Sequence, residues 1–202
     1  MKIALIGASG NAGQRLHTEL VSRGHDVTAI ARNPEKIQPL ERTVALAGDI
    51  AEPRSLATTL AGHDAVISSV MFRAFDHGKM LDAVIRSEVP RYLVVGGAGG
   101  LEVAPGVRFL DSADFPEVAR PESEAGIAYL ERLTKTDGLD WTFLAPSALF
   151  GPGERTGDFR LGKDQLLVGP DGSHMSYEDL AVAMVDELEK PKHSRARFTV
   201  GY

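Results

Sequence analysis

Cysteine is absent from the 202 residues of this sequence. A disulfide framework, a thiolate metal site and a cysteine nucleophile are therefore excluded. Histidine occurs at six positions, but the spacing of these residues is not that of a metal site. We expect no resident metal ion.

Long hydrophobic runs and an excess of basic residues are also lacking. No apolar stretch approaches the roughly 20 residues that span a membrane, and no signal peptide precedes the first predicted strand. Twenty-two basic and 28 acidic residues give a formal net charge of −6. Because nucleic acids and membrane surfaces attract basic faces, neither is an expected partner. These absences predict a soluble cytoplasmic protein.

A hydrophobic fraction of 43% is enough for a full core, and the length favours one domain over residues 1–202. Short apolar runs, typical of strands covered on both faces, alternate with helix-like stretches. Strands are predicted at Lys2–Ile6, Asp26–Ala31, Thr43–Ala47, Ala65–Ser68, Tyr92–Val95 and Trp141–Leu144. Helices are predicted at Asn11–Arg23, Pro53–Leu60, Phe75–Ser87, Glu122–Thr136 and Tyr177–Glu189. This alternation predicts an α/β fold with a doubly wound, mainly parallel sheet.

The most informative segment is a glycine turn between the first strand and the first helix. Gly7, Gly10 and Gly13 recur at every third position. Glycine is required there because a Cβ would block the tight turn and the close approach of a pyrophosphate. The helix dipole would add a positive end, with phosphate-binding backbone N–H groups at Ser9, Asn11 and Ala12. With a strand before it and a helix and second strand after it, the turn predicts a dinucleotide site.

The end of the second strand favours one dinucleotide over the other. Proteins that prefer NAD carry an acidic side chain near this point, which binds the ribose 2′-hydroxyl. Here Ala31 is followed by Arg32 and Asn33, and the acid is missing. Because a guanidinium pairs with a phosphate and stacks on adenine, Arg32 favours NADP(H).

Three later strand ends are expected to complete the cofactor site. Asp49 could accept a hydrogen bond from an adenine amino group, with Ile50 against the ring, or it could cap the helix that starts at Pro53. The ends of the fourth and sixth strands are expected beside the pyrophosphate and the nicotinamide. The predicted cofactor-binding residues are Gly7, Ser9, Gly10, Asn11, Ala12, Gly13, Arg32, Asp49, Ile50, Ser68, Ser69, Val70, Pro146 and Ser147.

Two long loops interrupt the alternation, at residues 96–118 and 151–173. Both follow the carboxyl ends of predicted strands, where open α/β sheets bind ligands, and loops of this length are often functional. We expect them on the substrate side of the domain. Candidate pocket residues are His77, Phe72, Phe109, Phe150, Arg155 and Tyr177.

Taken in order, these motifs resemble those of an atypical short-chain dehydrogenase/reductase, in the NAD(P)H-binding group of NmrA-like proteins and flavin/biliverdin reductase B. The resemblance covers most of the chain. It is carried by the segments 7–13, 31–34, 48–50, 94–99, 139–146 and 176–181. It implies a Rossmann fold, a bound nicotinamide dinucleotide and a cytoplasmic redox setting.

The sequence departs from the wider family at its acid/base pair. Typical members use Tyr-x-x-x-Lys, but Tyr92, Tyr129 and Tyr177 are each followed four residues later by a residue other than lysine, and Tyr202 is the last residue. The serine expected after the fifth strand is also missing, since glycine and alanine stand there. The apparatus of alcohol and ketone reduction is therefore not found, and no catalytic residue is assigned.

Three functions remain open. Hydride transfer from NADPH to a small planar acceptor, flavin- or quinone-like, requires mainly alignment of donor and acceptor by the protein. A non-catalytic NADP(H)-binding redox sensor is the alternative, because such a protein needs no acid/base pair. A sugar-nucleotide epimerase or dehydratase is disfavoured, since it needs the tyrosine and a larger substrate region. The partners expected are a small-molecule acceptor and, for the chain itself, either none or a second copy.

Overall fold

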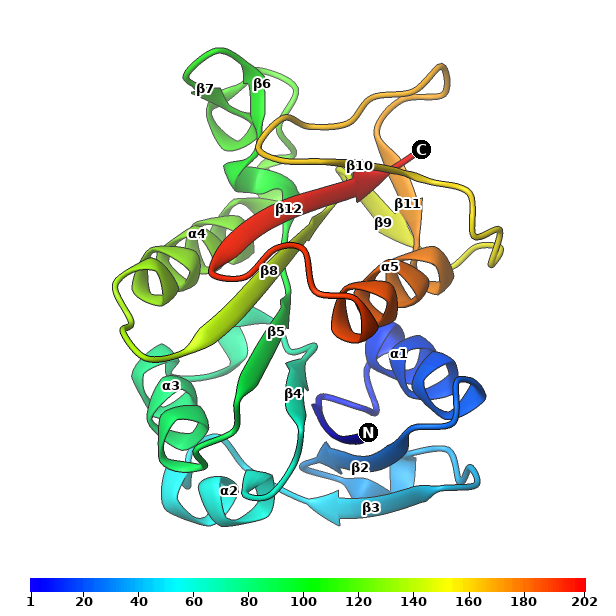
Figure 1. Cartoon of the computed structure of the whole chain (residues 1–202). Helices are drawn as coiled ribbons and strands as arrows, with labels where there is room; N and C mark the ends of the chain where they lie inside the picture. Colours follow the sequence, from blue (N-terminus) through cyan, green and yellow to red (C-terminus); the bar gives the residue numbers. More distant parts are fainter.

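A central sheet of eight strands organises the computed structural model, which describes all 202 residues. Its strands are β1 (Lys2–Ile6), β2 (Asp26–Ala31), β3 (Thr43–Ala47), β4 (Ala65–Ser68), β5 (Arg91–Val95), β8 (Asp140–Pro146), β10 (Arg160–Gly162) and β12 (Ala196–Gly201). They lie in the order β10-β12-β8-β5-β4-β1-β2-β3 (Figure 1). All neighbours are parallel except β10 and β12. The predicted doubly wound, mainly parallel sheet is confirmed.

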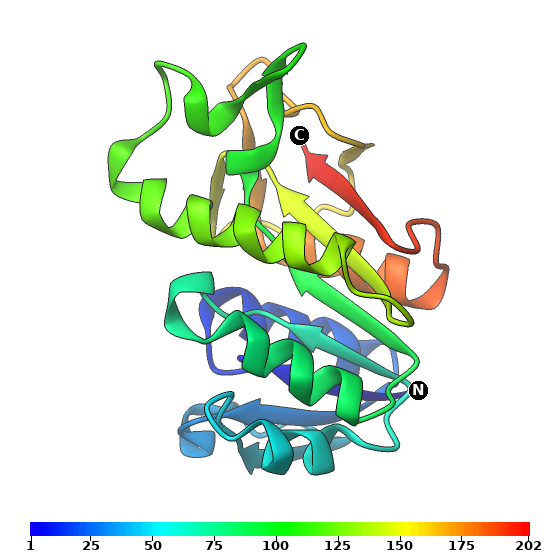
Figure 2. The ribbon, with the colours of Figure 1, turned by 90° about the vertical axis from the view of Figure 1, so that its left-hand side faces the viewer.

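Helices cover both faces of this sheet. On one face lie α1 (Asn11–Ser22) and α5 (Tyr177–Glu189). The opposite face carries α2 (Pro53–Leu60), α3 (His77–Arg86) and α4 (Arg120–Thr134), which stand in front of the sheet in Figure 2. Because side chains alternate along a strand, β1 feeds both cores: Ile3 and Leu5 pack with α1 and α5, and Ala4 and Ile6 with the other three helices.

The sheet changes winding direction at β1. This strand pairs with β2 on one side and with β4 on the other, so the connections leave it in opposite directions. Chain segments that diverge in this way leave a crevice at the carboxyl ends of the strands. The glycine turn that follows β1 therefore lies where ligands bind in such sheets.

The predicted helices and strands are confirmed, with bounds that differ by at most two residues. Two strands of the sheet, β10 and β12, were not predicted. In β12, Phe198 and Val200 are buried, but Arg197 and Thr199 alternate with them and break the apolar run. Strand β12 forms because it pairs with β8 and β10, and the local sequence does not indicate this pairing.

The two long loops emerge from the carboxyl ends of β5 and β8. The first contains a small hairpin, β6 (Glu102–Ala104) and β7 (Val107–Arg108). The second is bracketed by β9 (Leu149–Gly151) and β11 (His174–Ser176), which pair in parallel, and it supplies the edge strand β10 (Figure 1).

No helix in the structure has the length and apolar character that a membrane crossing requires. No group of three His, Asp or Glu side chains is arranged to hold a metal ion.

Candidate functional site

The glycine turn between β1 and α1 is built so closely that side chains are excluded. Gly7 has a φ of +85°, and a Cβ added there would lie 2.3 Å from the carbonyl oxygen of Ser69. A Cβ at Gly13 would lie 2.0 Å from the carbonyl oxygen of Gly7. The turn thus packs against the loop after β4 on one side and the first turn of α1 on the other.

The N-terminus of α1 has no side-chain cap. Gly10 occupies the N-cap position without a side-chain hydrogen bond, and the first turn contains no acidic residue. The leading N–H groups of a helix have no partner within the helix, so here they remain for an external acceptor. Gln14 steadies the turn from within, because its side-chain amide donates to the carbonyl of Ser9 at 3.0 Å. The arrangement suits a phosphate.

This turn opens onto a crevice of about 440 Å³. The structure brings eight of the predicted cofactor residues to its walls: Gly7, Ser9, Gly10, Arg32, Asp49, Ile50, Ser69 and Val70. Asn11, Ala12 and Gly13 form the first turn of α1 and do not line the crevice with their side chains. Four strand ends that lie far apart in the sequence thus meet at one crevice.

The polar side chains of the crevice that follow β2 and β3 differ in how they are engaged. Arg32 is exposed and forms no hydrogen bond or ion pair with other residues, so its guanidinium is free for a ligand. Asp49 accepts a hydrogen bond from the backbone N–H of Ala51 at 2.8 Å. The N-cap of α2 is Glu52, so Asp49 fixes its own turn and does not cap that helix. One carboxylate oxygen of Asp49 remains for an outside donor.

One wall of the crevice consists of residues that were not among the predicted cofactor-binding residues. This wall is the segment after β4 and the start of α3, which contributes Met71, Ala74, Phe75, Asp76 and Lys79. The Lys79 ammonium donates to the carbonyl of Ala51 at 2.8 Å and places a second cation near Arg32. The signal available was positional, because segments after β4 border the point where the sheet changes direction.

Three predicted residues lie differently from the expectation. The side chain of Ser68 is buried and shares a 2.8 Å hydrogen bond with the hydroxyl of Tyr92, directed into the core under α4. Ser147 is buried as well and donates to the carbonyl of Val200 at 3.2 Å. Neither these two nor Pro146 lines the crevice. The hydroxyl of Ser68 is hydrogen-bonded to a side chain of β5, and that of Ser147 to the backbone of β12. These partners are far away in the sequence, so the local sequence did not indicate them.

No tyrosine lines the crevice, and three of the four tyrosines have a raised pKa. Tyr92 and Tyr129 are buried and share a 2.9 Å hydrogen bond. Burial raises the pKa of Tyr92 to about 12 and raises that of Tyr129 well above its ordinary value. The pKa of Tyr202 is raised too, mainly by burial. These shifts are opposite to the lowering that a catalytic tyrosine requires.

His77 is held as part of the scaffold. Its Nε2 lies 3.0 Å from the carbonyl oxygen of Phe72, and its ring packs against Tyr129 with the centroids 5.0 Å apart. Phe72 is itself buried and stacks on Phe143. Phe109 packs against Phe115 in the first long loop. None of these predicted pocket residues lines the crevice.

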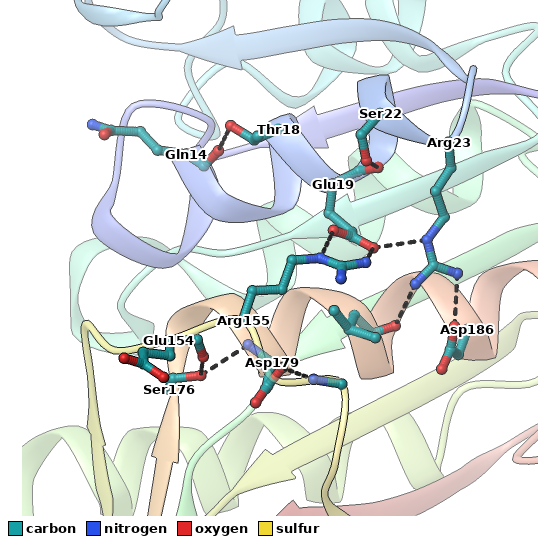
Figure 3. Close-up of polar contacts among 12 residues, drawn as sticks. Gln14, Thr18, Glu19, Ser22, Arg23, Glu154, Arg155, Ser176, Asp179 and Asp186 are labelled. Carbon is teal, nitrogen blue, oxygen red and sulfur yellow. Dashed lines mark hydrogen bonds and ion pairs between the residues drawn. The ribbon is translucent and has the colours of Figure 1, made fainter.

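A larger cavity, of about 700 Å³, lies beyond β8 under the second long loop. Phe150 lines it, as predicted, and Tyr177 packs edge-on against Phe150 with the centroids 4.4 Å apart. Arg155 does not line it. Figure 3 shows that Arg155 instead reaches to Glu19 on α1, where two of its nitrogens lie 2.8 Å from the carboxylate.

The loop over this cavity is fixed by a buried carboxylate. Asp179, at the start of α5, accepts hydrogen bonds from the hydroxyl of Thr156 at 2.5 Å and the backbone N–H of Gly157 at 2.8 Å. The hydroxyl of Tyr202 lies 2.7 Å from the same group. Burial by itself would raise the pKa of Asp179, but these hydrogen bonds outweigh it and hold the pKa below its ordinary value. Asp179 is thus a fixed negative charge behind the cavity.

Comparison with known proteins agrees with this geometry. The family model described as NAD(P)H-binding matches residues 7–191, from the glycine turn to the end of α5. The uncharacterised protein YwnB of Bacillus subtilis is 42% identical to this chain. The alignment runs over 214 positions, gaps included, and covers 99% of this chain and 98% of that protein.

Two solved structures extend the match to three dimensions. One, from Bacteroides thetaiotaomicron and provisionally named an epimerase, has a TM-score of 0.93 and 43% identity over 100% of this chain and 96% of its own. Another, from Streptococcus pneumoniae and provisionally named an NADH-flavin reductase, has a TM-score of 0.86 and 35% identity over 100% and 99% of the two chains. Together with the family model, they show that this chain belongs to the NAD(P)H-binding family and has a Rossmann fold.

Proposed function

We propose that the protein is an NADPH-dependent reductase of a small planar acceptor, flavin- or quinone-like. The observation that carries the cofactor part is the uncapped N-terminus of α1 above a turn in which Gly7 and Gly13 admit no Cβ. Such a cradle fits a pyrophosphate, because its N–H groups are free and the backbone can be approached closely. Ser9, Gly10 and the first turn of α1 would hold that group.

The choice of NADP(H) over NAD(H) rests on two cations and a missing acid. Arg32 and Lys79 both line the adenosine end of the crevice, and Arg32 has no partner of its own. The residue before Arg32 is Ala31, so no carboxylate is available there for a ribose 2′-hydroxyl. A 2′-phosphate carrying two negative charges would gain from both cations.

The reaction proposed needs little from the protein beyond alignment. The reduced nicotinamide supplies a hydride, and a conjugated acceptor takes this electron pair together with one proton from water. The chain's own contribution is to hold both rings at the carboxyl edge of the sheet. This fits a crevice that no tyrosine lines and from which His77 is held away by its contact with the backbone carbonyl of Phe72.

A titration of the protein with NADPH and with NADH tests the cofactor proposal. We expect NADPH to bind at least about tenfold more tightly, and Arg32→Ala to remove that preference, a change of about 1.4 kcal/mol. Arg86→Ala is the matched control, because Arg86 lies at the far end of α3 and pairs only with Asp82. Equal binding of the two cofactors, unchanged by Arg32→Ala, would refute the assignment.

A non-catalytic redox sensor remains the second candidate, since the absence of a usable tyrosine favours it equally. The two are separated by turnover with a panel of flavins and quinones. NADPH oxidation by at least one acceptor supports the reductase, whereas tight NADPH binding with no oxidation supports the sensor. Although one relative is provisionally named an epimerase, the raised pKa values of Tyr92 and Tyr129 argue against that chemistry here.

A further inference from the structure

The cavity under the second long loop is separate from the dinucleotide crevice. The two share no lining residue. Leu149, Phe150 and Met175 give the larger cavity apolar walls, and its volume of about 700 Å³ lies in the range of small-molecule sites. A flat ring system with two or three fused rings is of a size that fits it.

Its position connects it to the phosphate-binding helix. Phe150, in its wall, packs on Tyr177, and the guanidinium of Arg15 lies 5.9 Å from the centre of the Tyr177 ring. Arg15 in turn donates to the carbonyl of Asn11, in the first turn of α1, at 3.4 Å. This chain of contacts leads from the cavity wall to the start of α1. The cavity therefore lies on the side of the molecule that carries the start of α1, next to the helix whose N-terminus faces the crevice.

The loop that covers the cavity is held by both helices of that face. Glu178 accepts from the backbone N–H of Gly153 at 2.9 Å, and Ser176 donates to the carbonyl of Glu154 at 2.8 Å. Further along, Arg155 reaches Glu19 (Figure 3), and the hydroxyl of Thr156 donates to Asp179. A loop fixed at four successive residues presents a preformed wall, which lowers the entropic cost of binding.

The charge around the cavity has one sign. Glu154 and Asp158 line it, and their carboxylates have no hydrogen-bonded partner, while no lysine or arginine lines it. The nearest arginines are engaged elsewhere: Arg155 pairs with Glu19, and Arg160 donates to the backbone oxygens of Val168 and Tyr202. His174 supplies the one imidazole among the lining residues, and the carboxylate of Asp179 lies behind the wall.

From these observations, and resting on the proposed reductase function, we infer that this cavity is the acceptor site and that it selects flat acceptors without negative charge. Unpaired carboxylates repel a phosphate or sulfonate carried by the ligand. Riboflavin and FMN share one ring system and differ by a phosphate, so they isolate this effect. Neutral and sulfonated naphthoquinones form a second such pair.

The test compares riboflavin with FMN at pH 8, where histidine side chains are largely neutral. Two readouts are taken: quenching of flavin fluorescence by the protein saturated with NADP⁺, and kcat/KM for NADPH oxidation. We expect riboflavin to be favoured about tenfold at low ionic strength in both, with the gap narrowing as salt is added. The double variant Glu154→Gln/Asp158→Asn should reduce the preference for riboflavin over FMN severalfold, because FMN should bind more tightly and react with a higher kcat/KM.

The double variant Glu131→Gln/Asp137→Asn is the control, because it changes the net charge equally at exposed positions outside the cavity. This control should leave the ratio of riboflavin to FMN unchanged, both in binding and in kcat/KM. Riboflavin bound preferentially without turnover would sustain the cavity as a site for flat ligands without negative charge, but it would refute the reductase function and with it the role of the cavity as an acceptor site. Turnover that favours FMN, a ratio that does not respond to Glu154→Gln/Asp158→Asn, or no binding of either flavin would overturn the inference.

Discussion

At the glycine turn, individual atoms determine what the crevice can hold. Gly7 and Gly13 are required by the fold itself, because a Cβ added at either would lie 2.3 Å or 2.0 Å, respectively, from a backbone oxygen. Gly10 differs, because a Cβ there would lie 3.3 Å from the carbonyl oxygen of Gly7, a contact that a small shift relieves. It also lines the crevice and caps α1, so the space it leaves serves the ligand more than the fold.

We therefore expect Gly10→Ala to separate binding from stability. The added methyl would intrude on the phosphate cradle and weaken NADPH binding by about tenfold or more, while changing the free energy of unfolding by less than about 1.5 kcal/mol. Isothermal titration and urea unfolding measure the two effects. Gly151→Ala, where the Cβ meets nothing within 4 Å, is the control for NADPH binding. Unaltered NADPH affinity in Gly10→Ala would contradict the proposed placement of the pyrophosphate.

Among the elements, α1 joins the cofactor crevice to the loop over the second cavity. Its N-terminus faces the crevice, and two turns later Glu19 receives both Arg155 from the loop and Arg23 from its own helix (Figure 3). The side chain of Glu19 is only 6% exposed, whereas that of Arg155 is 56% exposed. A buried carboxylate with two cationic partners fixes the loop at this point.

This cluster predicts an acid-dependent loss of stability. The hydrogen bond from Arg155, followed by that from Arg23, outweighs burial and lowers the pKa of Glu19. Because the folded pKa lies below the unfolded one, the stabilisation is complete above the ordinary glutamate value of about 4.3 and is lost as the pH falls through the folded pKa. Glu19→Gln should cost about 1–3 kcal/mol at pH 7 and progressively less below about pH 4. Urea unfolding between pH 3 and 7 measures this, with exposed Glu131→Gln as control; a cost independent of pH would count against the assignment.

For the whole molecule, cofactor binding and folding are linked. The crevice is formed by segments after β1, β2, β3 and β4, so it exists only when the sheet is assembled. A ligand that binds only the folded state stabilises it by about 2.7 kcal/mol at a concentration of 100 Kd, which corresponds to roughly 5–11 °C in Tm for a domain of this size.

Thermal unfolding with and without NADPH tests this linkage. We expect Tm to rise with NADPH concentration, and NADH at equal concentration to raise it less. Arg32→Ala should bring the two curves together. An NADPH-dependent rise in Tm that persists in full in Arg32→Ala would exclude Arg32 as the source of the preference.

The sequence by itself determined the order of the strands and helices, the glycine turn and the family, because these depend on local patterns. Apolar runs, glycine spacing and the residues after β2 are each readable within a few positions. Arg32 and Asp49 could be proposed in this way, since a parallel sheet places all its strand ends at one edge.

Only the tertiary structure decided what depends on distant partners. Ser68 and Ser147 followed the right strands, yet Tyr92 and the backbone of β12 engage their hydroxyls inside the core. Lys79 joined the crevice because α3 starts beside the loop after β3. The second cavity and its acidic rim exist because Glu19 and Asp179 hold a loop that lies more than 130 residues from α1. Such contacts are set by packing across the sheet, and no local pattern encodes them.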